Sequence, residues 1–328
     1  MDSLKIYSQS DIDNLIIHRK EERKLGENVG IYHPNDSLSI DKISLEGLKN
    51  SSAKFVLLGI PEDIGVRANS GVAGTSTTWR PALVAFLNIQ SNQFLNGKEI
   101  LVLGHFEIEE PEDSEIDGLR VKVSEIDNLV YPVIEKIVAA GKIPIVIGGG
   151  HNNAFPMIKG TSLAHKKAID VLNIDAHADL REQEGRHSGN GFTYALAEKF
   201  LENYFMYGLH QNYNNEAILN QIESNPQLKA VFFDDILKGI KEQNFFTGLS
   251  PIAGLEIDLD SIQNVLSSAE TPSGFSVNDI RRLILTNEKR FSYLHISEGA
   301  TRLLDGRVSK LTSKLIAYLV SDFVKAQA

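Results

Sequence analysis

The segment NIDAHADLR (residues 173–181) alternates two alanines with Asp175, His177 and Asp179. Side chains two positions apart in an extended segment point to the same side of the chain. The segment therefore presents two carboxylates and one imidazole together, and these groups are ligands for divalent metal ions. Because two aspartates beside a histidine repel each other unless they are paired or bind a metal, the pattern favours a metal site over a polar loop.

Two other apolar runs end in side chains that can bind a metal. IPIVIGGGH leads into His151, and GLEIDLD contains Glu256, Asp258 and Asp260. Each has a structural explanation when taken alone, because glycines form turns without any function and aspartates cap the element that follows. Taken with residues 173–181, they predict one site of two imidazoles and four carboxylates. The predicted ligands are His151, Asp175, His177, Asp179, Asp258 and Asp260.

Six ligands exceed the number that one catalytic ion with an open position needs. Four carboxylates offset most of the charge of two divalent ions, and ions about 3.5–4 Å apart can share a carboxylate. The chain contains no cysteine, which excludes disulfides, thiolate catalysis and thiolate zinc sites. The oxygen-rich ligand set favours Mn²⁺ or another hard-to-borderline divalent ion. The expected chemistry is attack of a water of lowered pKa on an electrophilic carbon.

Short apolar runs alternate with amphipathic segments from residue 54 onward, which predicts parallel strands joined by helices on both faces of a sheet. Strands are predicted at 54–60, 99–105, 142–149, 168–175, 203–209, 229–235, 252–260 and 290–297. Helices are predicted at 123–141, 191–202, 276–288 and 310–326. Ligands of an open parallel sheet bind outside the carboxyl ends of its strands, which is where the three candidate segments lie.

The remaining features of the sequence indicate how the chain is organised and which partners its charge disfavours. Residues 1–50 are polar, with helical periodicity at 10–23, and are predicted to be an N-terminal extension packed on one domain at 51–328. The acidic segment 107–118 is predicted to be a solvated loop. The net charge of −10 argues against nucleic acid or an anionic membrane as the main partner. With no signal segment and no apolar run of spanning length, we expect a cytoplasmic protein.

The order of the motifs GG-x-H, D-A-H-x-D and D-x-D resembles that of the arginase/agmatinase/formimidoylglutamase superfamily. The resemblance extends from LLGIPEDIGVRANSG (57–71) to LHISEG (294–299) and so covers most of the chain. It implies a three-layer α/β/α fold with a central, mostly parallel sheet, and a single arginase-like catalytic domain over 51–328. It also implies two Mn²⁺ ions per subunit, a small amidine or guanidine substrate, and a homo-oligomer.

The resemblance implies a division of the six ligands between two ions. His151 and Asp179 would hold the first ion, and His177 and Asp260 would hold the second. Asp175 and Asp258 would bridge the two ions.

Three further roles concern the reaction itself. Glu298, after the strand FSYLHIS, matches the family's glutamate that pairs with the amidine or guanidine group. Asp179 would orient the nucleophile and receive its proton. His187 is the candidate shuttle that protonates the departing amine, because imidazole titrates near neutral pH. Within the segment EGRHSGNGF (184–192), residues 188–190 can also be aligned with a Ser-Gly-Asn sequence of arginases. In that alignment His187 would be only a loop residue. Asn190 is a candidate substrate contact.

The chain departs from the usual family patterns at three places. In the first motif, GGGHNN stands where arginases and agmatinases usually have Asp before the histidine and Ser after it. In the third motif, Glu256 replaces a usual serine and Gln263-Asn264 replaces a common Asp-Pro. The segment 184–192 stands where other members place a catalytic-loop histidine. None of these changes removes a predicted metal ligand. They leave open which neighbouring residues orient the metal ligands and which substrate is used.

The motif GGGH, with IPEDIGVRANSG and HADLR, is most similar to the formimidoylglutamase branch. Those enzymes hydrolyse N-formimidoyl-L-glutamate to L-glutamate and formamide in histidine degradation. Because that substrate carries two carboxylates, Arg67, Arg181 and Arg186 are candidate contacts, although for each arginine taken alone an ordinary surface ion pair is the better explanation.

Three alternatives remain open at the level of the sequence. An arginase or agmatinase would use the same site to release urea. A catalytically silent relative would keep the fold as a binding or scaffold protein and would bind manganese weakly or not at all. A two-metal phosphatase is disfavoured, because no phosphate-binding glycine loop at a helix start accompanies the ligands.

Overall fold

The apolar runs form a central sheet in the computed structural model, which describes residues 3–33, 45–239 and 245–328. The strands lie in the order β1-β4-β3-β5-β10-β9-β6-β7-β8, and β2 also pairs with β4. Every pair is parallel except that of β1 with β4. The strands are β1 Leu4–Ile6, β2 Gly30–Ile31, β3 Phe55–Gly59, β4 Ile100–Phe106, β5 Ile143–Ile147, β6 Ile169–Ile174, β7 Leu201–Leu209, β8 Leu228–Phe232, β9 Ala253–Asp258 and β10 Tyr293–Ser297.

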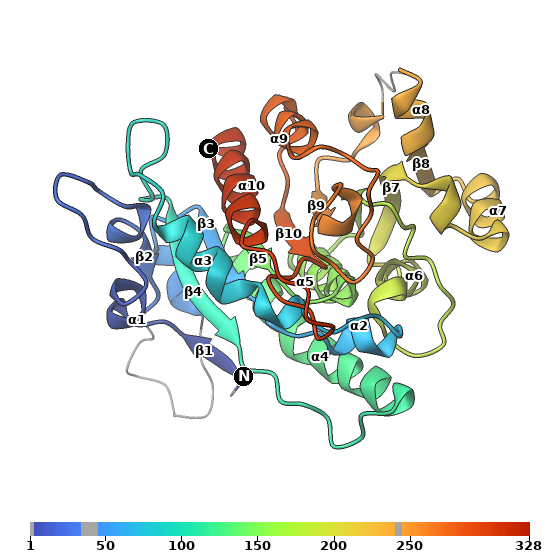
Figure 1. Cartoon of the computed structure of the whole chain (residues 1–328), viewed down its shortest axis with the longest axis horizontal. Helices are drawn as coiled ribbons and strands as arrows, with labels where there is room; N and C mark the ends of the chain where they lie inside the picture. Colours follow the sequence, from blue (N-terminus) through green and yellow to red (C-terminus); the bar gives the residue numbers. More distant parts are fainter. Residues whose placement is uncertain (1–2, 34–44, 240–244) are drawn as a thin grey trace.

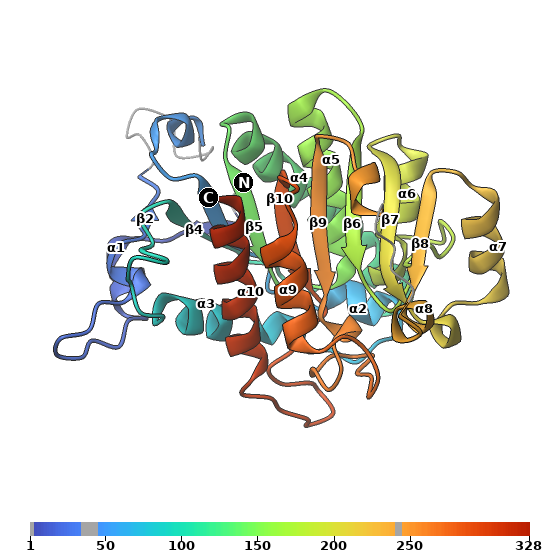
Figure 2. The same cartoon turned by 90° about the horizontal axis from the view of Figure 1, so that it is seen from above.

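Helices cover both faces of this sheet (Figures 1 and 2). Helices α3, α9 and α10 pack on one face, and α4, α5 and α6 pack on the other. The described helices are α1 Gln9–Asp13, α2 Ile64–Ala68, α3 Trp79–Leu87, α4 Ile116–Ala139, α5 Ala154–His165, α6 Gly191–Ala197, α7 Glu216–Ser224, α8 Phe233–Leu237, α9 Val277–Thr286 and α10 Thr312–Gln327.

The strands are apolar on both faces because each face has its own core. In β5, Ile145 and Ile147 belong to the core under α3, α9 and α10, whereas Val146 belongs to the core under α4 and α5. This alternation is the period of two that an extended chain imposes. The predicted three-layer α/β/α class with a mostly parallel sheet is therefore confirmed.

All eight predicted strands are present, and the differences lie at element ends. The predicted strand 229–235 ends at Phe232, where α8 begins. The predicted helix 123–141 begins earlier, at Ile116, so the end of the acidic segment 107–118 is helical. The predicted helix 191–202 ends at Ala197, and Lys199 then takes a φ of 63° that turns the chain into β7.

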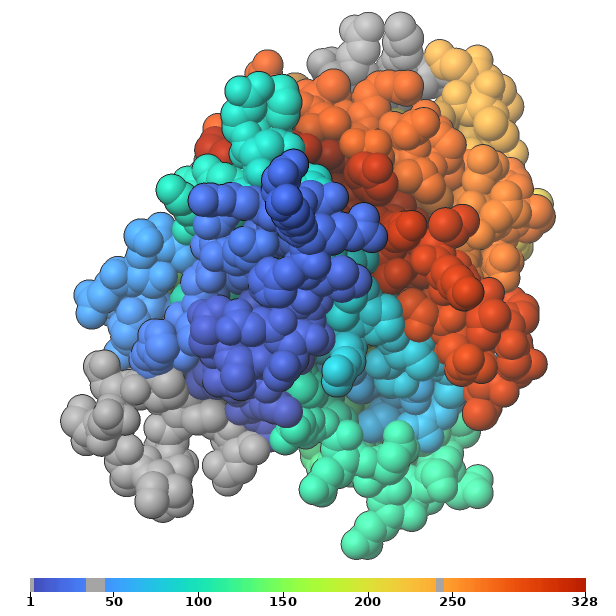
Figure 3. Space-filling view, turned by 60° about the vertical axis from the view of Figure 1, so that its left-hand side comes forward, coloured from blue at the N-terminus to red at the C-terminus, as the bar shows by residue number. Residues whose placement is uncertain are grey.

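The N-terminal residues do more than pack on the main body, because two of their segments join the sheet. β1 extends its edge antiparallel to β4, and β2 pairs with β4 in parallel. The helical periodicity at 10–23 is realised only over Gln9–Asp13. Residues 34–44 of the predicted extension lie outside the described part. Figure 3 shows the N-terminal residues covering one side of the molecule, above the protruding acidic segment.

The strand order determines where the functional side chains meet. β5, β10, β9 and β6 are consecutive in the sheet and parallel, so their carboxyl ends lie side by side. Each of these ends leads into a segment with candidate site residues. Across the described ranges, no helix has both the length and the apolar character that crossing a membrane requires.

Candidate metal centre

The six predicted ligands converge at the carboxyl edge of the sheet. After β5, three glycines lead to His151, which begins a short 3₁₀ turn at His151–Asn153. After β6 come Asp175, His177 and Asp179, and β9 ends at Asp258 and leads into Asp260.

A first group of ligands surrounds one nitrogen of His151. Its Nδ1 lies 2.9 Å from Asp179 Oδ2, and it lies 3.1 and 3.2 Å from an oxygen of Asp258 and of Asp175. The side chains of His151 and Asp175 are completely buried, and that of Asp258 is nearly so. One nitrogen and three carboxylate oxygens within 4.8 Å of one another are a suitable donor set for a divalent ion.

A second group lies beside the first and shares one residue with it. His177 Nδ1 is 3.2 Å from Asp260 Oδ2 and 3.6 Å from Asp175 Oδ1. Asp175 therefore directs one carboxylate oxygen to each histidine, which is the arrangement expected of a bridging ligand. Asp258 belongs to the first group only, so its predicted bridging role stays a prediction.

The donor set fits metal ions because several buried polar atoms otherwise lack partners. Three buried atoms have no hydrogen-bond partner in the described structure. They are the two ring nitrogens of His151 and Oδ1 of Asp260. Buried polar atoms are normally hydrogen-bonded. Four aspartates against two imidazoles also leave negative charge that a divalent ion would neutralise.

Two site residues adopt backbone conformations that side chains rarely take. Asp179 has a φ of 50° and Glu298 has a φ of 60°. A non-glycine residue in the left-handed region costs on the order of 1 kcal/mol or more, and such residues cluster at functional sites. At these two positions the backbone turns each carboxylate toward the cluster.

Without metal, the cluster retains protons. Burial alone would lower the pKa of His177, but the carboxylates of Asp260 and Asp175 outweigh burial and raise it. Burial, together with repulsion from Asp175 and Asp258, raises the pKa of Asp179 to about 6. Burial and the nearby Asp258 also raise the pKa of Asp260. Protons therefore occupy lone pairs that a metal ion would use.

Glu298, the residue predicted to bind the amidine group, stands beside the first group of ligands. Its Oε1 accepts the backbone N–H of His151 at 2.8 Å. Burial, and then the charge of Asp258, raises the pKa of the Glu298 carboxyl well above its usual range. No arginine or lysine among the described residues pairs with Glu298, and a buried carboxylate in this position is suited to receive a cationic group of a ligand.

Gly150 is explained by the space around it. A Cβ there would lie 2.6 Å from Asn152 Oδ1 and 3.2 Å from Glu298 Oε1. A larger side chain at this position would therefore clash with Asn152 and crowd Glu298.

Glu62 was not predicted, yet its carboxylate holds the glycine turn. Oε1 accepts the N–H of Gly150 at 2.9 Å and the amide of Asn153 at 2.6 Å, and Oε2 accepts the N–H of Gly65. Glu62 follows the predicted strand 54–60 by two residues, so the rule that found the ligands could have found it as well.

Asn214 was also missed, and it fixes the segment between the ligands. Its Oδ1 accepts the N–H of Ala178, and its Nδ2 donates to the carbonyls of Ala176 and His210. Nothing in the sequence around residue 214 distinguishes this asparagine from its neighbours.

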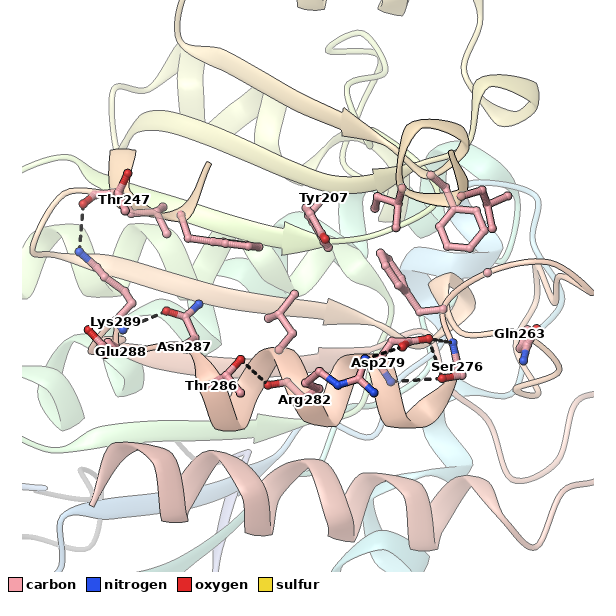
Figure 4. A pocket seen from close by; sticks show the side chains of 18 residues that line it. Tyr207, Thr247, Gln263, Ser276, Asp279, Arg282, Thr286, Asn287, Glu288 and Lys289 are labelled. Carbon is pink, nitrogen blue, oxygen red and sulfur yellow. Dashed lines mark hydrogen bonds and ion pairs between the residues drawn. The ribbon is translucent and has the colours of Figure 1, made fainter. Parts of the chain in front are cut away.

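Two cavities open beside the cluster. The inner one, of about 120 Å³, is lined by Asp179, Asp258, Asp260 and Glu298 among others. The outer one, of about 550 Å³, shares His177, Asp179 and Asn69 with the inner one and continues past Arg181. A larger cavity of about 900 Å³ lies against α9 and is lined by none of the six ligands; its lining combines apolar side chains such as Phe275 with polar ones such as Asp279 and Lys289 (Figure 4).

The structure places only one predicted arginine in these site cavities. Arg181 lines the outer cavity with a half-exposed side chain, which pairs with Glu184. Arg67 lines neither cavity and pairs with Asp63 and Glu110.

The prediction that Arg186 and Asn190 contact the substrate requires correction, because both side chains are buried in the protein interior. The Arg186 guanidinium donates to both oxygens of Asp127, to Asn190 Oδ1 and to the carbonyl of Asn152. Asn190 donates hydrogen bonds from its Nδ2 to the carbonyls of Glu182 and Gly185. These bonds brace the loop before α6 against the turn that contains His151.

His187 is placed differently from the predicted shuttle. Its Nδ1 accepts the N–H of Gly189 at 3.1 Å, its Nε2 lies 3.2 Å from Glu184, and its ring lines neither cavity. Burial, the largest cause, lowers the pKa of His187 to about 4. At neutral pH the ring is therefore uncharged, which is unsuited to donating a proton and fits a role in shaping the loop.

Comparison with known proteins places this arrangement in a family. The sequence model of the arginase family matches residues 53–251. A formimidoylglutamase of Macrococcus caseolyticus is 25% identical over 320 residues, which cover 95% of this chain and 97% of that protein. A formimidoylglutamase of Streptococcus pyogenes is 28% identical over 190 residues, and this match covers 56% of the chain but only 55% of that relative.

Solved structures of related enzymes have the same fold. A Trypanosoma cruzi formiminoglutamase variant with Mn²⁺ superposes with a TM-score of 0.74 at 18% identity, covering 94% of this chain and 98% of the other. The Bacillus subtilis formimidoylglutamase gives a TM-score of 0.72 at 15% identity, covering 94% and 93%. An arginase from Medicago truncatula gives 0.69 at 18% identity, covering 86% and 91%.

Metal binding is expected to strengthen as the pH rises. Because the raised pKa values of His177 and Asp260 leave protons on the metal-free cluster at neutral pH, the ion of the second group must displace them. The apparent affinity for Mn²⁺ should increase about tenfold per pH unit for each proton displaced. Titration calorimetry between pH 6 and 8, in buffers of different ionisation enthalpy, measures both quantities. An affinity that does not change with pH would contradict this protonation of the cluster.

Replacing Arg186 is expected to destabilise the fold. Arg186→Met leaves Asp127 charged and buried without a partner, so the free energy of unfolding should fall by about 3–5 kcal/mol. Arg67→Met is the matched control, since its more exposed ion pairs should contribute about 1 kcal/mol or less. Urea unfolding measures both variants. If Arg186→Met kept full stability and raised KM instead, Arg186 would be a substrate contact after all.

Proposed function

The chain belongs to the arginase family, and on that basis we propose that it is a binuclear-metal hydrolase of linear amidines whose substrate is N-formimidoyl-L-glutamate. The products would be L-glutamate and formamide. The observation that supports the proposal most is the pair of ligand groups that share Asp175. The name of the Macrococcus caseolyticus relative, which matches over nearly its whole length, supports the choice of substrate.

We propose Mn²⁺ as the metal, held by His151, Asp175, Asp179 and Asp258 in one group and by Asp175, His177 and Asp260 in the other. When bound, two such ions lower the pKa of a water molecule so that it is a nucleophile near neutral pH. The support for two sites rather than one is the buried negative charge that a single ion would leave uncompensated.

Glu298 would pair with the amidinium group of the substrate. Its carboxylate is held at the wall of the inner cavity by the N–H of His151, so its position is fixed before substrate arrives. An ion pair between this carboxylate and the amidinium would orient the reacting carbon toward the ligand cluster.

Asp179 would accept the proton of the attacking water. Its carboxylate lines the inner cavity beside Glu298, where the attacking water and the substrate would meet. Addition of water forms the new C–O bond, and the C–N bond to the glutamate nitrogen then breaks. The proton held by Asp179 would pass to that nitrogen, so that glutamate leaves as an amine and formamide remains.

Arg181 would bind a carboxylate at the far end of the substrate. It is the only arginine or lysine among the described residues that line the outer cavity, and Glu184 holds its guanidinium there. Asn215 and Gln221 line the same cavity and offer amide donors.

A second candidate function follows from the same cavity. Glu182 and Glu184 also line it, and two carboxylates would favour a substrate with a cationic far end. Such a substrate would be arginine or agmatine, hydrolysed to release urea. Whichever substrate is used, we propose a cytoplasmic homo-oligomer.

The substrate is tested by parallel assays of the manganese-supplemented protein on formimidoylglutamate, arginine, agmatine and guanidinobutyrate. We expect formamide release from formimidoylglutamate and no urea from the other three. Urea release would instead support the second candidate. Two bound ions without turnover of any compound would contradict the assignment, and absence of bound metal would indicate a catalytically silent relative.

Arg181→Gln tests how the far end of the substrate is recognised. Loss of a charged hydrogen bond worth about 1.5–3 kcal/mol should raise KM for formimidoylglutamate about 10- to 100-fold while changing kcat less. Arg120→Gln is the matched control, because Arg120 also contacts Glu184 but does not line the cavity. Steady-state kinetics give both constants. An unchanged KM in Arg181→Gln would exclude this contact.

A further inference from the structure

A buried side chain behind His151 suggests how the first ligand group is held in place. We propose that Glu256 is a positioning residue that accepts a hydrogen bond from His151 Nε2 and so directs Nδ1 toward the metal. The inference rests on the proposed function, because it concerns the ion that His151 would bind.

The two ring nitrogens of His151 face different partners. Nδ1 faces the carboxylates of the first group, whereas Nε2 lies 3.6 Å from Glu256 Oε2. Among the acidic side chains that pair with His151 in the described structure, Glu256 is the only one whose closest approach is to Nε2. A histidine that binds metal through one nitrogen commonly donates its other N–H to a carboxylate, which fixes the ring and leaves the first lone pair free.

Glu256 is itself held rigidly by the next strand of the sheet. Its Oε1 accepts the hydroxyl of Tyr293 at 2.8 Å, and its Oε2 lies 2.5 Å from His295 Nδ1. His295 stands directly beside Glu256 in the pairing of β10 with β9, and all three side chains are fully buried. Their side chains therefore fill the layer of the sheet immediately behind His151.

Gly254 provides the space for this network. A Cβ at residue 254 would lie 2.1 Å from the ring of Tyr293. Residue 254 therefore has to be glycine for the Tyr293 hydroxyl to reach Glu256.

A purely structural explanation would pair Glu256 with His295 alone. That explanation leaves His151 Nε2 buried without any hydrogen bond. A shift of a few tenths of an ångström, of the kind that a bound ligand imposes, would bring Nε2 within hydrogen-bond distance of Oε2. The two explanations differ in one consequence, which is the effect of Glu256 on metal affinity.

The effect should be confined to one of the two ions. Glu256 faces His151 of the first group, but in the described structure no ion pair within 4.0 Å joins it to His177 of the second group. Loss of the carboxylate should therefore weaken Mn²⁺ binding by the first ligand group and leave Mn²⁺ binding by the second group unchanged. A general distortion of the site would weaken both.

The test is Mn²⁺ titration of the metal-free wild type, Glu256→Gln and Tyr293→Phe, followed by calorimetry and by electron paramagnetic resonance. Wild type should bind two ions per chain. In Glu256→Gln, the Mn²⁺ affinity of one site should fall about 10- to 100-fold and that of the other site should not change. When metal is limiting, the spectrum of this variant should show no spin coupling between two ions. Tyr293→Phe removes one of the hydrogen bonds that fix this carboxylate, so it should weaken binding of the same ion by a smaller factor and leave the other ion unchanged.

Glu256→Asp is the second variant, in case Glu256→Gln does not fold. It keeps the charge but withdraws the carboxylate from His151, so the same selective weakening is expected. Unchanged affinities in either folded variant, or equal weakening of both ions, would overturn the role of Glu256 and leave the proposed function intact. A wild-type protein that binds no metal would instead overturn the proposed function itself.

Discussion

The repulsion among four aspartates at one edge of the sheet, three of them buried, is the constraint on which the rest of the site depends. Asp175, Asp179, Asp258 and Asp260 converge with only two imidazoles to offset their charge. Such a cluster is stable only if protons or metal ions supply the missing positive charge. The raised pKa values at the site and the unpartnered nitrogens of His151 are two consequences of this single condition.

The sheet makes the convergence possible, and a surrounding layer of hydrogen bonds makes it rigid. Parallel pairing of β5, β10, β9 and β6 brings their carboxyl ends together. Glu62 fixes the glycine turn from one side, and the Arg186–Asp127 pair braces the loop before α6 against that turn. Side chains held by such contacts need little rearrangement when a ligand binds, which is how a site maintains a reactive geometry.

The metal ligands could be predicted because they follow apolar strands at a period of two, a pattern that burial alone does not explain. The fold class followed from the alternation of strands and helices for the same reason. Arg186 and Asn190 were misplaced because the sequence does not show whether a loop side chain faces the cavity or the interior. Helix ends were displaced where a backbone conformation such as that of Lys199 overrode the amphipathic pattern. Asn214 acts through backbone contacts between distant segments, which leave no local signal.

The central claim is that one shared carboxylate, Asp175, joins two metal sites. Anomalous X-ray scattering from a crystal grown with Mn²⁺ tests it most directly. Two peaks about 3.5–4 Å apart are expected, one beside His151 and one beside His177, with Asp175 in contact with both. A single peak, or two peaks that do not share Asp175, would contradict the claim.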